Sequence, residues 1–387
     1  MQKVNLLYVI TKLELGGAQK QLLSLISHLD KSKYRIFLFT AHQGFLIQNA
    51  SLISDLTLYR SKYLKRQINP TKDIIALIEI FRFIKKNKIE IVHTHGSKAG
   101  ILGRIAAKLA GKKFIIHTVH GWSFNDFQPF FIRNIFICLE RLTAQFTKRL
   151  IVVSSYDKGK GLENGIGKES NYTIIRYGIN KDEFLLKDRS IKEELGIKDS
   201  DLVVGMISCL KPQKSPQDFV RLAFQINQIL PQMKFILIGD GVLRYRVEKL
   251  VRRYNLQKNL ILTGWRRDIP RILSAIDIFV LTSLWEGLPI SVLEAMASAK
   301  PVVATHTGGI EEVIIEGKTG FLIPVRDVKK MSDRLITLLK DGNLRKELGQ
   351  NARDFLDGSY HLENMVNANQ DLYENLVKDR ASRKCRP

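Results

Sequence analysis

The chain has 387 residues, 45% of them hydrophobic, which is enough for two domains with cores of their own. Its three cysteines, Cys138, Cys209 and Cys385, are widely spaced and odd in number, which argues against a disulfide framework and fits a reducing cytoplasm. The net charge is +23, and residues 1–190 carry most of it, with 31 basic and 14 acidic residues.

Strands and helices alternate through the first half of the chain. Residues 4–10 (VNLLYVI) predict a buried strand, because the run is too short to span a bilayer and has no signal-cleavage pattern. No apolar run of about 18 residues occurs elsewhere, so no transmembrane helix is expected. The alternation predicts a Rossmann-like α/β domain. Its further strands are expected at residues 34–40, 91–95, 113–117 and 150–154, and its helices at 18–29, 74–87 and 100–110.

Histidines lie at the ends of two of these strands, His93 with His95 and His117 with His120. A zinc site is one interpretation, but no carboxylate or cysteine completes a ligand set, so no metal is expected. Histidines bonded to the backbone inside the core are the other interpretation, which fits His93 and His117 best.

Residues 124–149 are aromatic at their start, helical in period and basic at their end. A stretch of this kind can lie on a membrane surface, and it can equally be a helix packed on the core. Residues 60–66 (RSKYLKR) form a basic cluster, which we expect in a loop.

The second half repeats the alternation. Residues 277–323 hold a strand, a helix and a second strand, the pattern of a parallel βαβ unit, and a further helix is expected at 310–315. Ligands of such sheets bind beyond the carboxyl ends of the strands, where Ser283, Glu286 and Gly287 lie. Glu286 in the loop and Glu294 in the following helix can both face this edge. Other strands are expected at residues 201–208, 234–239 and 260–263, with helices at 217–229, 243–254, 331–339 and 344–378 and a frayed end at 379–387.

The run SLWEGLP, ISVLEAMA, KPVVAT and GG in this stretch resembles the donor-binding segment of family 4 glycosyltransferases, which are retaining enzymes with the GT-B fold. The resemblance implies two Rossmann-like, doubly wound domains facing a cleft, at residues 1–185 for the acceptor and 186–360 for a nucleotide sugar. It also implies a C-terminal helix and basic tail, residues 361–387, that cross back to the first domain. Glu286 would meet the donor sugar and Glu294 the ribose, within a pocket that includes Ser283, Gly287, Leu288 and Pro289.

Other segments carry the same resemblance. LGGAQ, with Gly16 and Gly17, is similar to a loop near the donor diphosphate, although a simple tight turn would also explain it. HTVHGW is similar to the segment whose histidine, here His120, approaches the reacting sugar; its imidazole would bond a sugar hydroxyl or position the acceptor, and His95 is the second choice. Trp265 would lie near the nucleobase, or be a packing aromatic.

The loop CLKPQKSP departs from the family pattern. The resemblance implies that Lys214 binds the donor diphosphate. The arginine that normally accompanies it is replaced by Cys209, and Lys211 is a candidate substitute for the missing charge.

We therefore expect a retaining glycosyltransferase that uses a UDP-sugar, with GDP-mannose as the rival donor. The acceptor would be a saccharide or lipid-linked saccharide of a cell-surface polysaccharide. No cofactor, metal or nucleic acid is expected. The enzyme would work in the cytoplasm, with attachment of its basic first domain to an anionic membrane surface as a further hypothesis. Three alternatives stay open: an inactive nucleotide-sugar-binding homologue, an epimerase of the same fold, and a polyanion-binding protein.

Overall fold

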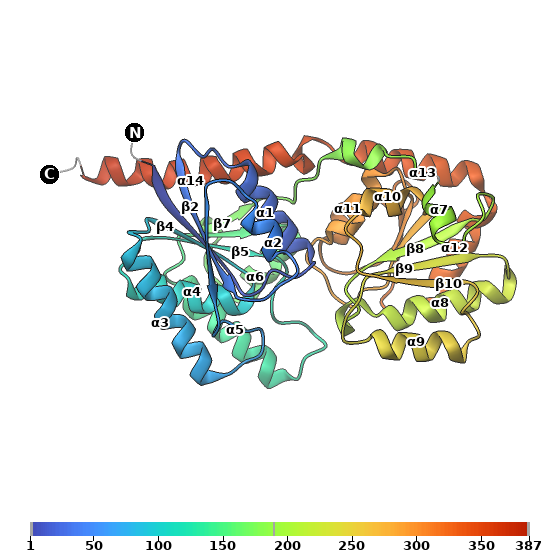
Figure 1. The fold of residues 1–387 in the computed structure, drawn as a ribbon, viewed down its shortest axis with the longest axis horizontal. Helices are drawn as coiled ribbons and strands as arrows, with labels where there is room; N and C mark the ends of the chain where they lie inside the picture. Colours follow the sequence, from blue (N-terminus) through green and yellow to red (C-terminus); the bar gives the residue numbers. More distant parts are fainter. Residues whose placement is uncertain (1–2, 189, 385–387) are drawn as a thin grey trace. The chain divides into compact units, whose positions relative to one another are not determined.

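The computed structural model describes residues 3–188 and 190–384. The chain divides into two compact units (Figure 1). Unit 1 runs to Gly178 and resumes at Leu362, and unit 2 is Ile179–His361. The division falls seven residues before the expected one at 185, because the short 3₁₀ helix η2 (Lys181–Leu185) packs on helices α10 (Ile269–Ser274) and α11 (Ile290–Ala297) of unit 2.

Unit 1 is built on a seven-stranded sheet in the order β3-β2-β1-β4-β5-β6-β7, and every neighbouring pair is parallel. Both faces of β1 are buried, since Leu6 and Tyr8 belong to one core cluster and Leu7 and Val9 to another. The strands are β1 (Val4–Ile10), β2 (Tyr34–Ala41), β3 (Leu56–Ser61), β4 (Ile91–His95), β5 (Phe114–Val119), β6 (Arg149–Val152) and β7 (Tyr172–Ile174).

Helices cover both faces of this sheet. The last helix of the chain packs beside α1 on one face, where Tyr373 and Leu376 join the same core cluster as Leu22 and Ile26. This is the return to the first domain that the resemblance implied. The helices are α1 (Gly17–His28), α2 (Ile47–Ser51), α3 (Pro70–Lys86), α4 (Ser97–Leu109), α5 (Phe130–Ala144), α6 (Ser155–Glu163) and α14 (Leu362–Lys384).

Unit 2 has a six-stranded parallel sheet in the order β10-β9-β8-β11-β12-β13. Its strands are β8 (Val203–Ile207), β9 (Lys234–Ile238), β10 (Leu260–Gly264), β11 (Ile278–Leu281), β12 (Val302–Thr305) and β13 (Gly320–Ile323). Its helices are α7 (Ser190–Glu194), α8 (Pro216–Ile229), α9 (Arg244–Arg253), α10 (Ile269–Ser274), α11 (Ile290–Ala297), α12 (Val328–Lys340) and α13 (Gly342–Phe355).

The two parallel sheets confirm the predicted pair of Rossmann-like units, with differences at the edges. The helix expected at residues 310–315 is wrong, because the segment forms only the 3₁₀ helix η4 (Gly308–Glu312) before β13. The prediction of a frayed end at residues 379–387 is wrong for residues 379–384, because these belong to α14. Residues 385–387 lie outside the described part of the chain. Within the described ranges, no helix combines the length and apolarity needed to cross a bilayer.

Candidate active site

In unit 2 the strand order changes direction between β8 and β11, which are neighbours in the sheet. Open parallel sheets bind ligands beyond the carboxyl ends of their strands at such a position. The loop after β8 carries Lys211 and Lys214, and the loop after β11 carries Ser283 and Glu286. The fold thus brings these residues, predicted from two distant segments, to one edge of the sheet.

The ammonium group of Lys214 forms an ion pair with Oε1 of Glu286. The hydroxyl of Ser283 donates to the same oxygen at 2.6 Å. Both charged side chains are largely buried, with 15% of Lys214 and 6% of Glu286 exposed. Since both contacts go to Oε1, and no described residue donates to Oε2, the second oxygen can accept a hydrogen bond from a ligand hydroxyl.

Side-chain to backbone hydrogen bonds fix these two loops against each other. The hydroxyl of Thr282 bonds the carbonyl oxygens of Lys214 and Ser215, each at 3.0 Å. The amide of Gln213 donates to the carbonyl oxygen of Trp285 at 2.8 Å. The geometry of the Lys214–Glu286 pair is therefore supported from the loops on which both residues lie.

Gly308, in the loop after β12, approaches the same place. Its φ of +61° is in the left-handed region, and a Cβ added there would lie 2.1 Å from the carbonyl oxygen of Glu286. The neighbouring backbone N–H of Gly309 donates to the carbonyl oxygen of Gly287 at 2.7 Å. Glycine is needed at position 308 for both conformation and space.

The remaining residues predicted for the donor pocket lie around α11. Gly287, Leu288 and Pro289 are buried and lead into the helix, and Glu294 lies within it with 6% of its surface exposed. The expected placement, with one glutamate in the loop and one in the helix, matches the structure. The contacts of these residues with a nucleotide sugar stay predictions.

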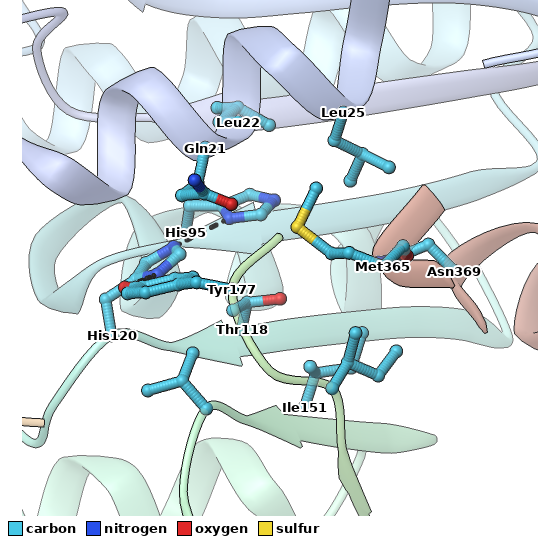
Figure 2. A pocket seen from close by; sticks show the side chains of 12 residues that line it. Gln21, Leu22, Leu25, His95, Thr118, His120, Ile151, Tyr177, Met365 and Asn369 are labelled. Carbon is cyan, nitrogen blue, oxygen red and sulfur yellow. Dashed lines mark hydrogen bonds between the residues drawn. The ribbon is translucent and has the colours of Figure 1, made fainter. Parts of the chain in front are cut away.

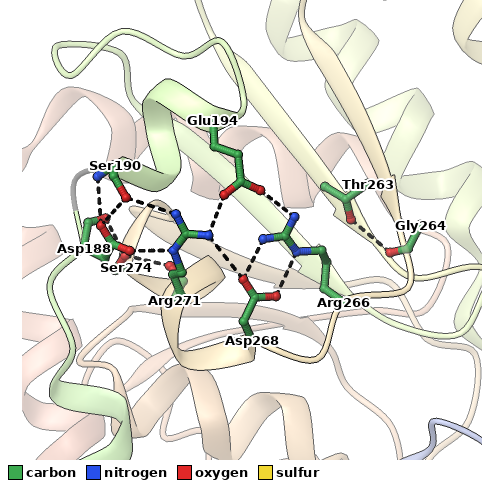
Figure 3. Close-up of polar contacts among 9 residues, drawn as sticks. All are labelled: Asp188, Ser190, Glu194, Thr263, Gly264, Arg266, Asp268, Arg271 and Ser274. Atoms are coloured by element: carbon green, nitrogen blue, oxygen red, sulfur yellow. Dashed lines mark hydrogen bonds and ion pairs between the residues drawn. The ribbon is translucent and has the colours of Figure 1, made fainter.

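Ion pairs fix the turn that carries Trp265 (Figure 3). The guanidinium group of Arg266 donates to both carboxylate oxygens of Asp268, at 2.8 and 2.6 Å, and to Glu194 at 2.6 Å. Arg271 also binds Glu194, and these hydrogen bonds hold the pKa of the Glu194 carboxyl below its usual range. Trp265 itself is half-buried, and its role at a nucleobase stays a prediction.

In unit 1 the strand order changes direction between β1 and β4. The loop after β1 ends at Gly16, Gly17 is the first residue of α1, and β4 ends at His95. Gly16 has a φ of −120°, which any residue can adopt, and the nearest atoms to a Cβ there would belong to the flexible Gln19 side chain. The backbone conformation therefore does not require glycine at 16, and close approach of a ligand stays the predicted reason for it.

His120 is hydrogen-bonded at both ring nitrogens (Figure 2). The hydroxyl of Tyr177 lies 2.7 Å from Nδ1, and Nδ1 of His95 lies 2.9 Å from Nε2. A neutral imidazole has one donor and one acceptor nitrogen, and both are used here. Both ring nitrogens of His120 therefore have partners within unit 1 in this structure, and the contact of this side chain with a sugar stays a prediction.

Burial keeps these rings neutral. It lowers the pKa of His120 to about 4, and it lowers the pKa of His93 to about 3 with a further contribution from His120. The pKa of His95 falls in the same direction for the same reason. Nε2 of His95 is buried without a hydrogen-bond partner among the described residues, and the ring lines a small pocket together with His120, Tyr177 and Met365.

The other two histidines support the sheet. The ring nitrogens of His93 lie 2.8 Å from the Tyr373 hydroxyl and 2.7 Å from the Thr118 hydroxyl. Nδ1 of His117 lies 2.9 Å from the Thr94 hydroxyl. In the described part of the chain, no group of three or more His, Cys, Asp or Glu side chains could hold a metal.

Cys209 is half-buried in the loop after β8, and its carbonyl oxygen accepts a 2.8 Å hydrogen bond from the backbone N–H of Lys211. Lys214 lies three residues after Lys211, at the end of the 3₁₀ helix η3 (Pro212–Lys214). Of the two lysines proposed for the diphosphate, Lys214 is thus the one that the structure places against Glu286.

Sequence reasoning did not single out Tyr177, which holds His120, or Tyr373, which holds His93. Tyr177 directly precedes Gly178, where the chain leaves unit 1, and its side chain is buried. Its place beside the predicted crossing between domains was the feature of the sequence that could have indicated a role. Tyr373 offered only a tyrosine within the predicted C-terminal helix.

Both units of the chain match family models of glycosyltransferases. Residues 15–183 match Glycosyltransferase Family 4, and residues 187–355 match Glycosyl transferases group 1. The UDP-Gal:alpha-D-GlcNAc-diphosphoundecaprenol alpha-1,3-galactosyltransferase of Escherichia coli is 33% identical over 384 residues, which cover 97% of this chain and 98% of that protein. The chain belongs to glycosyltransferase family 4.

Solved structures agree on the fold. Anabaena Alr3699/HepE in complex with UDP-glucose has a TM-score of 0.82 at 20% identity, covering 97% of this chain and 99% of its own. WaaG, a glycosyltransferase involved in lipopolysaccharide biosynthesis, has a TM-score of 0.79 at 16% identity, covering 94% and 99%. These likenesses establish the GT-B fold that the resemblance implied.

Proposed function

We propose that the chain transfers a hexosyl residue from a UDP-sugar to a hydroxyl of a lipid-linked saccharide during synthesis of a cell-surface polysaccharide. The Lys214–Glu286 pair at the β8/β11 edge carries this proposal, because it sets a cation for a diphosphate beside a carboxylate for a sugar. The name of the Escherichia coli relative supports it with UDP-Gal as donor and a GlcNAc-diphosphoundecaprenol acceptor. UDP-galactose is therefore the first donor to test, and GDP-mannose is the rival.

Each donor-site residue has a distinct role in this proposal. Oε2 of Glu286 accepts a hydrogen bond from a donor-sugar hydroxyl, and Glu294 accepts from the ribose. The ammonium group of Lys214 stabilises the negative charge of the diphosphate, together with the amino-terminal end of α8, which begins two residues later. Trp265 contacts the uracil ring. No metal is required, since these groups supply the positive charge.

We further propose that transfer retains the anomeric configuration. The acceptor oxygen bonds to the anomeric carbon on the face that the diphosphate leaves. The bond between that carbon and the diphosphate oxygen breaks, and the acceptor proton passes to the departing diphosphate. His120 shapes the sugar site through its fixed ring and its backbone, because both ring nitrogens are engaged within unit 1.

A lipid-linked acceptor places the reaction at a membrane. We propose that the enzyme works at the cytoplasmic face and attaches there through its basic first domain. Residues 1–190, with 31 basic and 14 acidic residues, would favour an anionic leaflet.

The direct test is nucleotide release from a panel of UDP- and GDP-sugars, with and without a GlcNAc-diphospholipid acceptor. Release from one UDP-hexose that rises when the lipid is added is the expected result. Anomeric proton couplings of the product report retention or inversion. Release from GDP-mannose alone would refute the UDP assignment, and release that no saccharide acceptor changes would refute the transfer reaction.

Cys209 favours a second candidate, a nucleotide-sugar-binding homologue without activity, because it replaces the arginine expected from the family pattern. The variant Cys209→Arg separates the two. A wild-type chain that binds UDP in calorimetry but transfers nothing, with activity appearing in Cys209→Arg, would support the inactive homologue. Activity in the wild type that Cys209→Arg does not raise would reject it.

A further inference from the structure

The outward face of helix α5 is apolar. Phe131, Ile135, Cys138 and Leu142 follow one another at steps of four, three and four residues, so they line one side of the helix. The exposed fractions are 65% for Phe131, 56% for Ile135 and 49% for Leu142, and Cys138 is also exposed. The solvent-facing side of a surface helix normally carries polar side chains, so the polarity of this face is the opposite of the usual one.

The inward face of the same helix carries a charged residue. The side chain of Glu140 is 2% exposed, and its Oε2 accepts a 2.6 Å hydrogen bond from Nη2 of Arg104 in α4, which makes the two an ion pair. The side chain of Arg104 is fully buried. Arg104 also donates from Nε to the carbonyl oxygen of Gly100 at 2.9 Å. Rotating α5 to bury the apolar stripe would break this pair and leave a charge buried without its partner, which is costly. The pair therefore fixes the outward direction of the apolar face.

The segment that enters α5 extends the apolar surface. Phe127 is 46% exposed and Phe130 is 77% exposed, directly before and at the start of the helix. Exposed aromatic side chains in one continuous stretch are unusual on a soluble surface and indicate an interaction site. We call these residues the α5 face: Phe127, Phe130, Phe131, Ile135, Cys138 and Leu142.

The chain segment that contains the α5 face is basic. Residues 97–165 contain 11 lysines and arginines, of which Arg104 is fully buried, and four acidic residues. Two of the acidic residues, Glu140 and Asp157, are buried, which leaves Asp126 and Glu163 near the surface. An apolar face within a basic surround matches a layer that has negative headgroups over an apolar interior.

We propose that the α5 face binds the surface of an anionic lipid bilayer. Its aromatic and aliphatic side chains enter the boundary between headgroups and acyl chains, and the surrounding lysines and arginines bind the headgroups. A second copy of the chain fits less well, because a two-fold interface through this face would bring two basic surrounds together. The inference deepens the proposed function, on which it rests, by naming the surface that delivers the enzyme to a lipid-linked acceptor.

Vesicle flotation of the full chain tests the proposal. Wild type should float with phosphatidylglycerol vesicles, float less at high salt, and stay unbound with phosphatidylcholine alone. The double variant Phe131→Ser/Ile135→Ser should bind at least about tenfold more weakly, since it removes two exposed apolar groups. The matched control is Leu52→Ser, which removes a 79% exposed apolar side chain from unit 1 away from α5. Unchanged thermal unfolding of both variants shows that they fold.

A fluorophore gives a second measurement at the face itself. Cys138 is exposed there, and in a chain with Cys209→Ser and Cys385→Ser it can carry an environment-sensitive label. The emission should shift to the blue with anionic vesicles and stay unchanged with neutral ones.

Three results would overturn the inference: wild type that ignores anionic vesicles, a double variant that floats as well as wild type, or a wild-type dimer that the double variant abolishes. Catalysis is scored separately, with a water-soluble short-chain acceptor that needs no membrane. Vesicle binding without any sugar transfer would refute the proposed function and leave the α5 inference standing.

Discussion

Lys214 and Glu286 form an ion pair between the loops that follow β8 and β11. The residues are 72 positions apart in sequence, and the change of strand order between β8 and β11 is what makes their loops neighbours. The hydroxyl of Ser283 shares the same carboxylate oxygen. The pair therefore holds a cation and a carboxylate in a fixed relation at the ligand-binding edge of the sheet.

Replacing Lys214 should impair catalysis more than donor binding. Lys214→Met removes a charge that the proposal places on the leaving diphosphate, so we expect kcat to fall by about 10²–10³-fold with a smaller change in KM. Steady-state UDP release measures both. Lys330→Met, at an exposed lysine of α12, is the control and should match wild type. A tenfold rise in KM at unchanged kcat would assign Lys214 to binding alone.

Tyr177→Phe should separate positioning of His120 from stability. The variant removes the hydroxyl at Nδ1 of His120, and Tyr373→Phe removes a hydroxyl that bonds both His93 and the Tyr8 hydroxyl. Each loss should lower the free energy of unfolding by about 1–3 kcal/mol, because a buried partner is left unpaired.

Only Tyr177→Phe should also lower kcat, by about tenfold, through misplacement of His120. Denaturant unfolding and UDP release on the two variants provide the comparison. The same kcat in both variants would show that Tyr177 has a structural role only.

Acid should destabilise unit 1 through its buried histidines. The pKa of His120 is about 4 in the folded chain against 6.5 for a free histidine, so the unfolded state binds more protons between these values. Stability is complete above about pH 6.5 and falls as the pH drops toward about 4, by about 3 kcal/mol for this residue. His93 adds to the loss in the same direction, because its pKa is about 3.

Unfolding free energies measured across this pH range provide the test. His120→Gln should have a shallower dependence than wild type. Equal slopes in the two proteins would contradict the assignment to His120.

Removing one member of the buried Arg104–Glu140 pair should lower the free energy of unfolding strongly, whereas replacing both members should lower it much less. Glu140→Leu leaves the guanidinium group buried and unpaired, and we expect a loss of about 3–5 kcal/mol. Arg104→Met/Glu140→Leu removes both charges and should recover most of that loss. Chemical denaturation of the three proteins measures it. If the double variant is as unstable as Glu140→Leu, the loss of stability comes from the missing hydrogen bonds of the pair and not from the unpaired charge.

The central elements of both sheets could be predicted because their residues signal them locally. The run of β1 is apolar on both faces, and Gly16 and Gly17 mark the start of α1. The edge strands β3, β7 and β13 were missed. The residues of β3 and β7 are mostly half-buried or exposed, so their short runs carry little apolar signal. Pairing with the neighbours β2, β6 and β12 is what makes these segments strands.

The candidate site was predictable as a set of residues but not as a set of contacts. Lys214, Glu286 and His120 were found through motif resemblance. The partners of these residues depend on tertiary structure: Tyr177 lies 57 positions from His120. That both nitrogens of His120 are occupied follows only from the packed structure.

UDP release from UDP-galactose in the presence of a GlcNAc-diphospholipid acceptor, compared between wild type and Glu286→Gln, tests the central claim most directly. The substitution keeps the size of the side chain and removes the charge that pairs with Lys214. The account predicts release that depends on the acceptor in wild type, a loss of at least about 10²-fold in Glu286→Gln, and no loss in Lys330→Met. Equal release by wild type and Glu286→Gln would contradict it.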